Sequence, residues 1–241
     1  MNPYLEIPSP RGRTIIVGDV HGCWNELVEI LDRVGFDDDD LLLCVGDLIN
    51  RGPETWHVAK FFRDTPNAQT ALGNHELRLA KYVRGEMSAG WSQLQALADL
   101  SPKKQRRWAD WLLDLPAVIA TPEVVIAHAR LDPDRPLEKQ KPVHVCGAGR
   151  GTVWIDQDKK GIPQWFHRQD EKRPICVGHI RYPQVELVKK RLFALDTGCV
   201  YGKRLTALVL PKRKIVSVPA EADHLANARA RWILQQRGKP A

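Results

Sequence analysis

The sequence predicts an α/β fold, and the arrangement of its apolar residues is what predicts it. Short runs of aliphatic and β-branched residues alternate with longer segments in which apolar residues recur at helical spacing. The short runs are apolar on both faces, which is typical of a largely parallel sheet covered by helices. Between residues 77 and 115 the helical spacing continues without a strand, which predicts a helical insertion. We expect one domain that spans residues 1–241.

The first part of the chain alternates strands with helices. Thr14–Val17 is a short β-branched run, and the following segment 24–34 has its apolar residues at helical intervals. Further strands are expected at 41–45 and 69–72, with a helix at 55–62 between them.

Strand signals resume after the helical insertion. They occur at residues 124–127, at Ile175–Val177, and in three runs at 192–195, 205–210 and 214–218. Because only short turn-like segments separate the last three runs, we expect them to form an antiparallel meander. A closing helix is expected at 222–236.

Composition limits the classes of protein that this chain can belong to. No stretch of 18 apolar residues occurs, and the first residues lack the apolar segment of a secretory signal. The five cysteines are scattered without a CxxC pair, so we interpret them as reduced, buried thiols and expect a cytoplasmic location without a membrane partner.

The net charge of +7 favours an anionic partner only weakly. The densest basic runs are 103–107, 189–191 and 212–214. We interpret them mainly as solvated helix faces and hairpin turns. A nucleic-acid partner stays an alternative that is not favoured, because no aromatic-interleaved binding motif accompanies them.

Polar residues with metal-binding side chains follow five of the predicted strands. In chain order, these residues are Asp19 and His21, Asp47, Asn74 with His75, His128, and His179. The carboxyl ends of strands are where open α/β sheets build their sites. Carboxylate oxygens and imidazole nitrogens suit Mn²⁺, Fe²⁺ or Zn²⁺, and a single Asp can bridge two ions. The set therefore predicts a two-metal site for a phosphorylated substrate.

Six short motifs resemble the phosphoprotein phosphatase family of metallophosphoesterases. They are GDVHG at 18–22, GDLINRG at 46–52, GNHE at 73–76, VIAHA at 125–129, VGH at 177–179 and LDTG at 195–198. The resemblance implies a two-sheet β-sandwich flanked by helices. It also implies two divalent metal ions, with Mn²⁺ favoured and Fe, Zn or Ni as alternatives. One ion would be held by Asp19, His21 and Asp47, and the other by Asp47, Asn74, His128 and His179.

The same resemblance implies roles for three further residues. A hydroxide that bridges the two metals would attack phosphorus, Arg51 would bind phosphate oxygens, and His75 would protonate the leaving oxygen. The family motif GDxVDRG has an aspartate where this chain has Asn50, a residue that would contact His75. Asn can still orient the imidazole, but it carries no charge to stabilise a proton on it.

A second departure concerns phosphate binding. Many bacterial relatives carry an arginine in a segment like LWIR, whereas this chain reads Trp154-Ile155-Asp156. Arg150 is a candidate substitute for substrate binding, and a solvated loop arginine is the alternative.

The sequence predicts a metal-dependent phosphoesterase that hydrolyses phosphomonoesters, similar to Ser/Thr protein phosphatases. The alternative is a diadenosine tetraphosphate, or dinucleoside polyphosphate, hydrolase, because 194–199 and the frame GDLINRGP resemble those enzymes. The end of the chain also resembles bacterial phosphatases associated with polynucleotide repair. A catalytically weak metal-binding module is a minor alternative, which Asn50 and Asp156 motivate. The expected partner is thus a phosphoprotein or a nucleotide polyphosphate.

Overall fold

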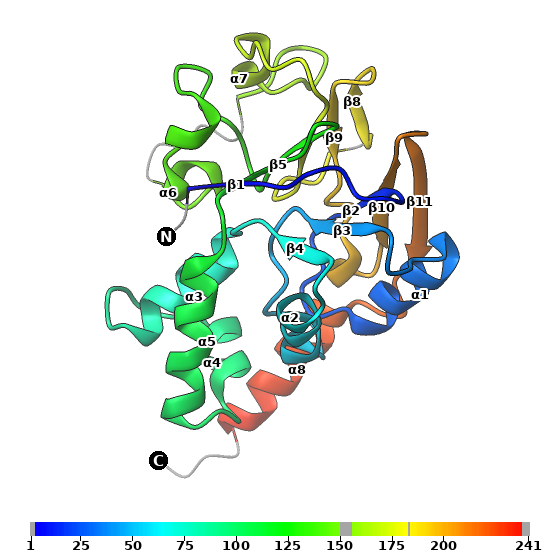
Figure 1. Ribbon diagram of the computed structural model, residues 1–241. Helices are drawn as coiled ribbons and strands as arrows, with labels where there is room; N and C mark the ends of the chain where they lie inside the picture. The colour runs from blue at the N-terminus through cyan, green and yellow to red at the C-terminus, as the bar shows by residue number, and fades with distance from the viewer. Residues whose placement is uncertain (1–2, 150–155, 183, 238–241) are drawn as a thin grey trace.

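The computed structural model of the chain describes residues 3–149, 156–182 and 184–237. Two β-sheets face each other in the middle of the molecule, and helices lie on their outer sides (Figure 1). This confirms the predicted α/β class and the two-sheet sandwich that the family resemblance implied.

Each sheet contains strands from distant parts of the chain. The six-stranded sheet has the order β1 (Tyr4–Glu6), β5 (Val118–Ala120), β6 (Val125–Ala127), β7 (Ile175–Val177), β9 (Leu192–Ala194) and β8 (Glu186–Val188). The five-stranded sheet has the order β11 (Lys214–Pro219), β10 (Arg204–Leu210), β2 (Thr14–Val17), β3 (Leu41–Cys44) and β4 (Ala68–Thr70).

Both sheets are mixed rather than largely parallel. Strands β2, β3 and β4 run parallel, and β10 pairs antiparallel with β2. The expected meander at the end of the chain is wrong, because β9 lies in the other sheet and pairs in parallel with β7. Of the three strands expected in the meander, β10 and β11 do pair as an antiparallel hairpin. A strand that is apolar on both faces fits any covered sheet, so its pattern does not specify its neighbours.

Alternation along the strands divides the core into layers. On β2, Ile16 belongs to the cluster between the sheets, whereas Ile15 and Val17 belong to the cluster beneath the helices. The side chains of strand β9 alternate in the same way in the other sheet, where Phe193 faces the partner sheet and Leu192 faces outward. Both faces of each sheet are therefore buried, as in sheets that are covered on two sides.

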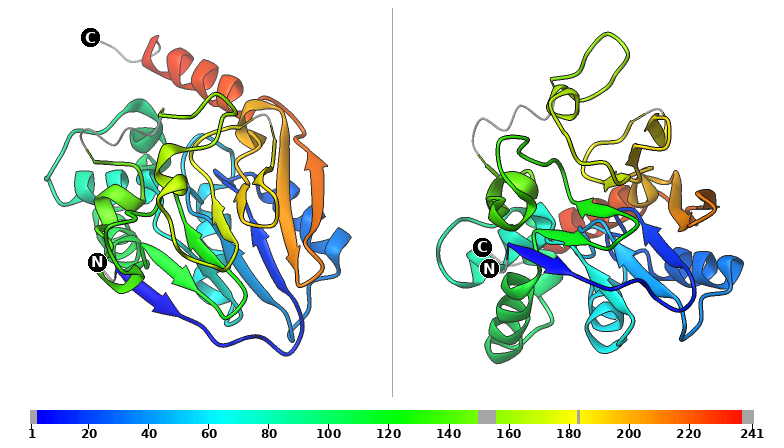
Figure 2. Two further views of the ribbon diagram at one scale, coloured as in Figure 1. Left: turned by 90° about the horizontal axis from the view of Figure 1, so that it is seen from above. Right: turned by 45° about the horizontal axis from the view of Figure 1, so that its top comes forward.

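The helices are mostly short. They are α1 (Trp24–Val34), α2 (Thr55–Asp64), α3 (Asn74–Val83), α4 (Trp91–Leu97), α5 (Pro102–Asp114), α6 (Pro142–Val145), α7 (Gln164–His167) and α8 (His224–Arg237), with 3-10 turns η1 (Leu137–Lys139) and η2 (Cys199–Tyr201). Helices α3, α4 and α5 lie in the predicted insertion. Seen from above, α8 lies at the edge of the molecule, beyond the ends of the strands (Figure 2).

Aromatic side chains join the insertion to the rest of the fold. The rings of Trp56 on α2 and Trp108 on α5 stack with centroids 4.8 Å apart, and Trp111 meets Trp108 edge-on at 5.6 Å. Trp108 and Trp111 both pack against the hydrophobic core. All five cysteines lie in the described part of the chain, where they are buried and form no disulfide. None of the described helices is long and apolar enough to cross a membrane.

Candidate active site

The loops that follow β2, β3, β4, β6 and β7 meet at one place, and the Asp47 carboxylate lies at its centre. Its Oδ2 atom is 3.6 Å from Nε2 of His21 and 3.4 Å from Nε2 of His128. Its Oδ1 atom accepts a hydrogen bond from the backbone N–H of His75 at 3.0 Å. One buried carboxylate thus lies between two imidazoles from different sheets.

Asn74 and Asp19 join the same group through His179. The side-chain oxygen of Asn74 is 3.1 Å from Nε2 of His128 and 2.9 Å from Nδ1 of His179. The carboxylate of Asp19 accepts the backbone N–H of His179 at 3.2 and 3.3 Å. The structure therefore brings together all six residues that the sequence predicted as metal ligands.

Backbone carbonyls orient two of the histidines. Nδ1 of His21 lies 2.9 Å from the carbonyl oxygen of Ile49, and Nδ1 of His128 lies 3.0 Å from that of Val45. Each Nδ1–H donates to its carbonyl, so Nε2 of each ring faces Asp47. Such partners fix both the tautomer and the direction of a ligating imidazole.

The site is built on backbone that ordinary residues rarely adopt. Five non-glycine residues of the site have positive φ angles, namely His21 (48°), Asp47 (56°), Asn50 (70°), Arg51 (72°) and His179 (67°). Left-handed backbone of this kind costs free energy and is concentrated at functional sites, where the surrounding structure holds it in place.

Two glycines make room for the carboxylates. A Cβ atom on Gly178 would lie 2.0 Å from Oδ1 of Asp19, and one on Gly73 would lie 2.2 Å from Oδ1 of Asp47. Any side chain at either position would displace a carboxylate of the site.

The carboxylate of Glu76 holds this backbone in place through hydrogen bonds. It is fully buried and accepts three backbone N–H groups, from Asp47 at 2.9 Å, from Gly73 at 3.1 Å and from Ile49 at 3.2 Å. Sequence reasoning missed this role, because Glu76 is there only the last residue of the GNHE motif. Its position beside two candidate ligands is the one signal in the sequence for this role.

Burial controls the protonation of most imidazoles in the site. Burial, together with the charge of Arg51, lowers the pKa of His21 to about 4, and burial together with His128 lowers that of His179 to about 4. Burial also holds the pKa of His75 well below its usual value. These rings are therefore neutral near pH 7, which is the form that can bind a metal ion.

His128 behaves differently because it faces Asp47 directly. Burial alone would lower its pKa, but the Asp47 carboxylate outweighs burial and raises the pKa to about 10. The pair thus holds a proton at the place where a divalent cation would displace it.

The predicted catalytic residues lie at the edge of this cluster. Nη1 of Arg51 donates to Nε2 of His21 at 2.9 Å. The expected contact between residue 50 and His75 is present, since Nδ2 of Asn50 lies 3.0 Å from Nδ1 of His75. The other amide atom of Asn50, Oδ1, is buried without a hydrogen-bond partner among the described residues.

Arg150, the predicted second phosphate-binding arginine, lies outside the described residues. A different arginine, Arg181, is near the site instead. Its guanidinium lies 3.9 Å from the ring centre of Tyr201, and that of Arg51 lies 5.7 Å from the same centre. Sequence reasoning missed Arg181, although it follows His179 by only two positions.

The donor atoms suit hard or borderline divalent cations. The donor atoms of His21, Asp47 and His75 lie within 4.8 Å of one another, as do those of Asp47, His128 and His179. Both groups consist of oxygen and nitrogen donors without a thiolate, a set that suits Mn²⁺, Fe²⁺ or Zn²⁺, and Asp47 belongs to both. The residues present therefore fit two neighbouring ions that share one carboxylate.

Comparisons with known proteins agree with this chemistry. The chain is 29% identical over 232 residues to an asymmetrical bis(5′-nucleosyl)-tetraphosphatase, PrpE, of Halalkalibacterium halodurans, covering 85% of this chain and 93% of the relative. It is 29% identical over 259 residues to a symmetrical bis(5′-nucleosyl)-tetraphosphatase of Nitrosospira multiformis, covering 83% of this chain and 93% of the relative.

Solved structures share the fold. A crystal structure described as a candidate diadenosine tetraphosphatase superposes with a TM-score of 0.73 at 30% identity, covering 91% of this chain and 99% of the other. A Ser/Thr phosphatase from Saccharomyces cerevisiae has a TM-score of 0.63 at 16% identity, covering 90% and 83%, which shows the fold alone. The profile of the family described as calcineurin-like phosphoesterase matches residues 12–210. The chain therefore belongs to the calcineurin-like phosphoesterase family, whose members are metal-dependent phosphoric ester hydrolases.

Proposed function

We propose that this phosphoesterase hydrolyses dinucleoside polyphosphates such as diadenosine tetraphosphate. This replaces our first choice from the sequence, a Ser/Thr protein phosphatase, by its alternative. The observation that carries the proposal is the contact between Asn50 and His75. A neutral amide cannot stabilise an imidazolium as a carboxylate does. A nucleotide leaving group departs readily as an anion, whereas a serine alkoxide needs the proton. The names of the relatives support the same choice.

In this proposal two divalent ions bind to the six strand-end residues. Asp19, His21 and Asp47 hold one ion, and Asp47, Asn74, His128 and His179 hold the other. When bound, the ions neutralise phosphate charge and make water a better nucleophile at neutral pH. Because each sheet contributes ligands, we also propose that the chain works as one domain.

The remaining residues bind and orient the substrate. The planar guanidinium of Arg51 binds two phosphate oxygens at once, a geometry that Lys cannot provide. His75 lies against His21, with ring centroids 4.7 Å apart, and in this proposal it would face the leaving oxygen. Asn50 holds the His75 ring in that direction without supplying charge.

A substrate panel tests the proposal. We expect kcat/KM for diadenosine tetraphosphate to exceed that for a phosphothreonine peptide and for 5′-triphosphorylated RNA. We also expect Mn²⁺ to give the highest rate among Mn²⁺, Fe²⁺, Zn²⁺ and Ni²⁺. The products locate the cleaved bond, since two ADP molecules mean symmetrical cleavage, and ATP with AMP means asymmetrical cleavage. A phosphopeptide turned over faster than the dinucleotide would restore the protein phosphatase assignment.

A further inference from the structure

A groove of about 710 Å³ opens beside the candidate active site. It begins at Arg51 and runs between α2, α4 and α5 until it reaches α8. Because Arg51 also donates to His21, one end of the groove adjoins the candidate metal ligands. A molecule that is held at the metals by one phosphate can therefore extend into the groove.

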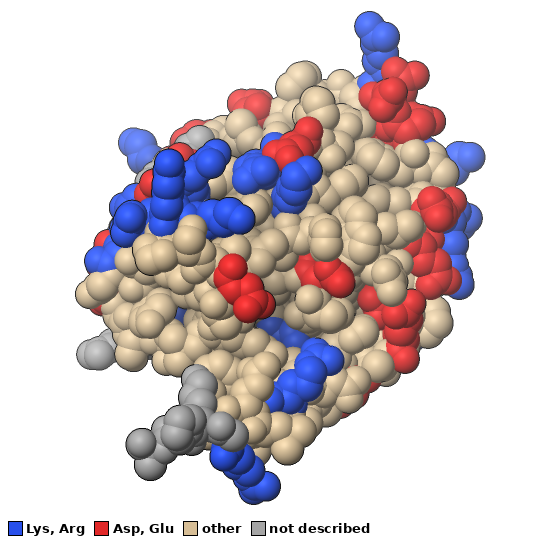
Figure 3. Space-filling model, turned by 90° about the horizontal axis from the view of Figure 1, so that it is seen from below, with Lys and Arg blue, Asp and Glu red and all other residues tan. Residues whose placement is uncertain are grey.

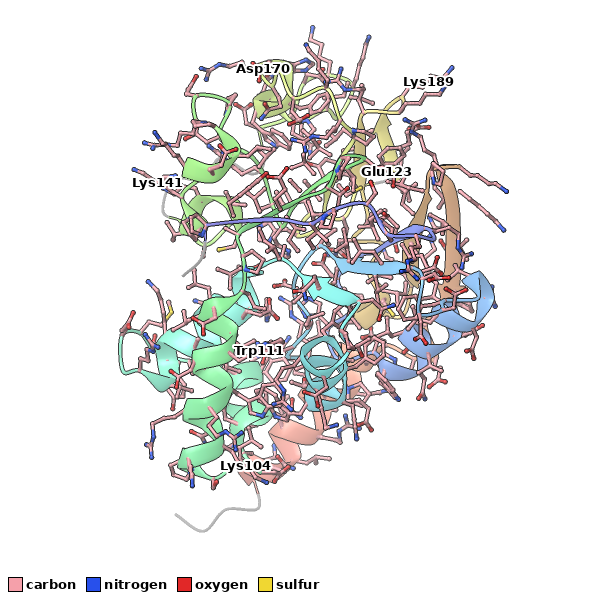
Figure 4. All side chains as sticks on the ribbon, in the orientation of Figure 1. Lys104, Trp111, Glu123, Lys141, Asp170 and Lys189 are labelled. Carbon is pink, nitrogen blue, oxygen red and sulfur yellow. The ribbon has the colours of Figure 1, made fainter. Side chains whose placement is uncertain are left out.

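Besides Arg51, three cations line the groove without a partner of opposite charge among the described residues. Lys104 and Arg107 project from one face of α5, three residues apart, and Arg231 projects from α8. Within the described part of the chain none of the three forms an ion pair. Figure 4 shows Lys104 at the end of α5 that is far from the sheets.

The balance of charge around the groove is positive. Lys60 and Arg63 also line it, and both pair with Asp64. Of the two acidic residues in the lining, Glu54 pairs with His57, and Asp99 has no cation partner among the described residues. Seen from below, Lys and Arg gather on one side of the molecule, whereas Asp and Glu lie mainly toward the opposite edge (Figure 3). Such a field attracts polyanions.

One wall of the groove is aromatic and held in place. Trp56 and Trp108 stack on each other, and the indole N–H of Trp56 donates to the carbonyl of Ala96 at 2.8 Å. The guanidinium of Arg63 covers Trp108 at 4.5 Å from the ring centre. This wall offers a rigid, partly apolar surface beside the cations, which suits a nucleoside joined to phosphate.

We propose that the groove binds the outer nucleotide of a dinucleoside polyphosphate, the half that lies beyond the cleaved bond. The proposal rests on the proposed function and extends it, because it assigns Lys104, Arg107 and Arg231 to the substrate. A volume of about 710 Å³ matches a small-molecule site and holds one nucleotide. We therefore choose a nucleotide over a nucleic-acid strand as the occupant.

Two double variants on the same helix test the groove. Lys104→Ala with Arg107→Ala removes two lining cations, whereas Lys103→Ala with Arg106→Ala removes two exposed cations outside the lining. Both variants lose the same charge, so a difference between them reports position rather than net charge. Thermal unfolding verifies that each variant is folded.

The first measurement is calorimetric binding of ADP and of inorganic phosphate to the Mn²⁺-loaded protein. We expect Lys104→Ala with Arg107→Ala to weaken ADP binding about 10- to 100-fold and to leave phosphate binding unchanged, because charge-assisted hydrogen bonds are lost only at the groove. The control pair should bind both ligands as the wild type does. Equal ADP affinity in the two variants, or no ADP binding by the wild type, overturns the groove assignment.

The second measurement separates this proposal from the proposed function. We expect the groove variant to raise KM for diadenosine tetraphosphate by a similar factor, with p-nitrophenyl phosphate kinetics unchanged. A wild type that hydrolyses p-nitrophenyl phosphate but not the dinucleotide refutes the proposed function, and ADP binding then still decides the groove. The proposal would also be overturned if an oligoribonucleotide bound the wild type more tightly than ADP and lost affinity for the groove variant. That result would assign the groove to nucleic acid.

Discussion

Replacing Glu76 by Gln tests whether its buried carboxylate holds the site together. The change keeps the size of the side chain and exchanges one oxygen for an NH₂ group. At present two oxygens accept the backbone N–H groups of Asp47, Gly73 and Ile49. In Glu76→Gln only one oxygen remains, so at least one buried N–H must lose its acceptor.

The size of the effect follows from that lost acceptor. An unsatisfied buried donor costs about 1–3 kcal/mol. Burial, with the charge of Asp47, raises the pKa of Glu76 to about 8, so near neutral pH the exchange removes a hydrogen-bond acceptor more than it removes a charge. We therefore expect the free energy of unfolding to fall by about 1–3 kcal/mol. Because Glu76 holds the backbone of Asp47, we also expect metal affinity to fall about tenfold or more.

Urea denaturation of the metal-free protein measures the first effect, and the Mn²⁺ concentration needed for half-maximal p-nitrophenyl phosphate hydrolysis measures the second. Glu29→Gln is the control, since the Glu29 side chain is 43% exposed on α1 and, among the described residues, pairs only with Arg33. The control should lose no more than about 0.5 kcal/mol. If Glu76→Gln matches the wild type in both its urea midpoint and its Mn²⁺ requirement, the role assigned to Glu76 is refuted.

Three further predictions concern the metals, the acid and the C-terminal helix. Asp47→Asn should abolish hydrolysis and reduce the number of divalent ions per chain that elemental analysis finds. Chelation should inactivate the wild type until Mn²⁺ is added. Full activity of the wild type after metal removal would contradict the two-metal assignment. Asn50→Asp should accelerate an alkyl phosphate more than p-nitrophenyl phosphate, because only the alkoxide needs a proton from His75; equal acceleration would argue against that contact's role. The hydrogen bond to Glu26 raises the pKa of His224 above 6.5. Burial would raise the pKa of Glu26, but the hydrogen bonds from His224 and from backbone N–H groups together outweigh burial and bring that pKa below 4.5. The ion pair between His224 and Glu26 therefore stabilises the fold fully between pH 4.5 and 6.5, and this stabilisation is lost as pH rises through the raised pKa of His224. His224→Gln should thus lower the unfolding free energy more at about pH 6 than at about pH 9. A loss of unfolding free energy that does not depend on pH would refute the pairing.

The sequence predicted the six ligand candidates that the fold brings together, because each of them is marked by a local motif. Asp47, for example, follows a strand whose apolar run is recognisable by itself, and parallel neighbours bring their carboxyl ends to one edge. The order of the motifs along the chain then indicated which side chains lie together.

Features that depend on tertiary pairing could not be predicted in this way. The run at 192–195 is apolar on both faces, so nothing in it distinguishes a place beside β7 from a place beside β10. The sequence favours a solvated helix face for the basic run that contains Lys104, and only the folded chain brings Lys104 to the same groove as Arg231. The support that Glu76 gives to backbone N–H groups leaves no periodic signal, because its partners are not side chains.

The left-handed backbone at the site has a consequence for large-scale mutagenesis. At His21 and Arg51 a glycine would adopt the observed φ without the penalty of about 1–2 kcal/mol that an L side chain incurs, although its freedom in the unfolded chain offsets part of the gain. A mutational scan scored by cellular abundance should therefore tolerate or favour glycine at these positions, while one scored by hydrolysis should reject it. The positions at which the two maps disagree would outline the catalytic centre without a ligand or a homologue.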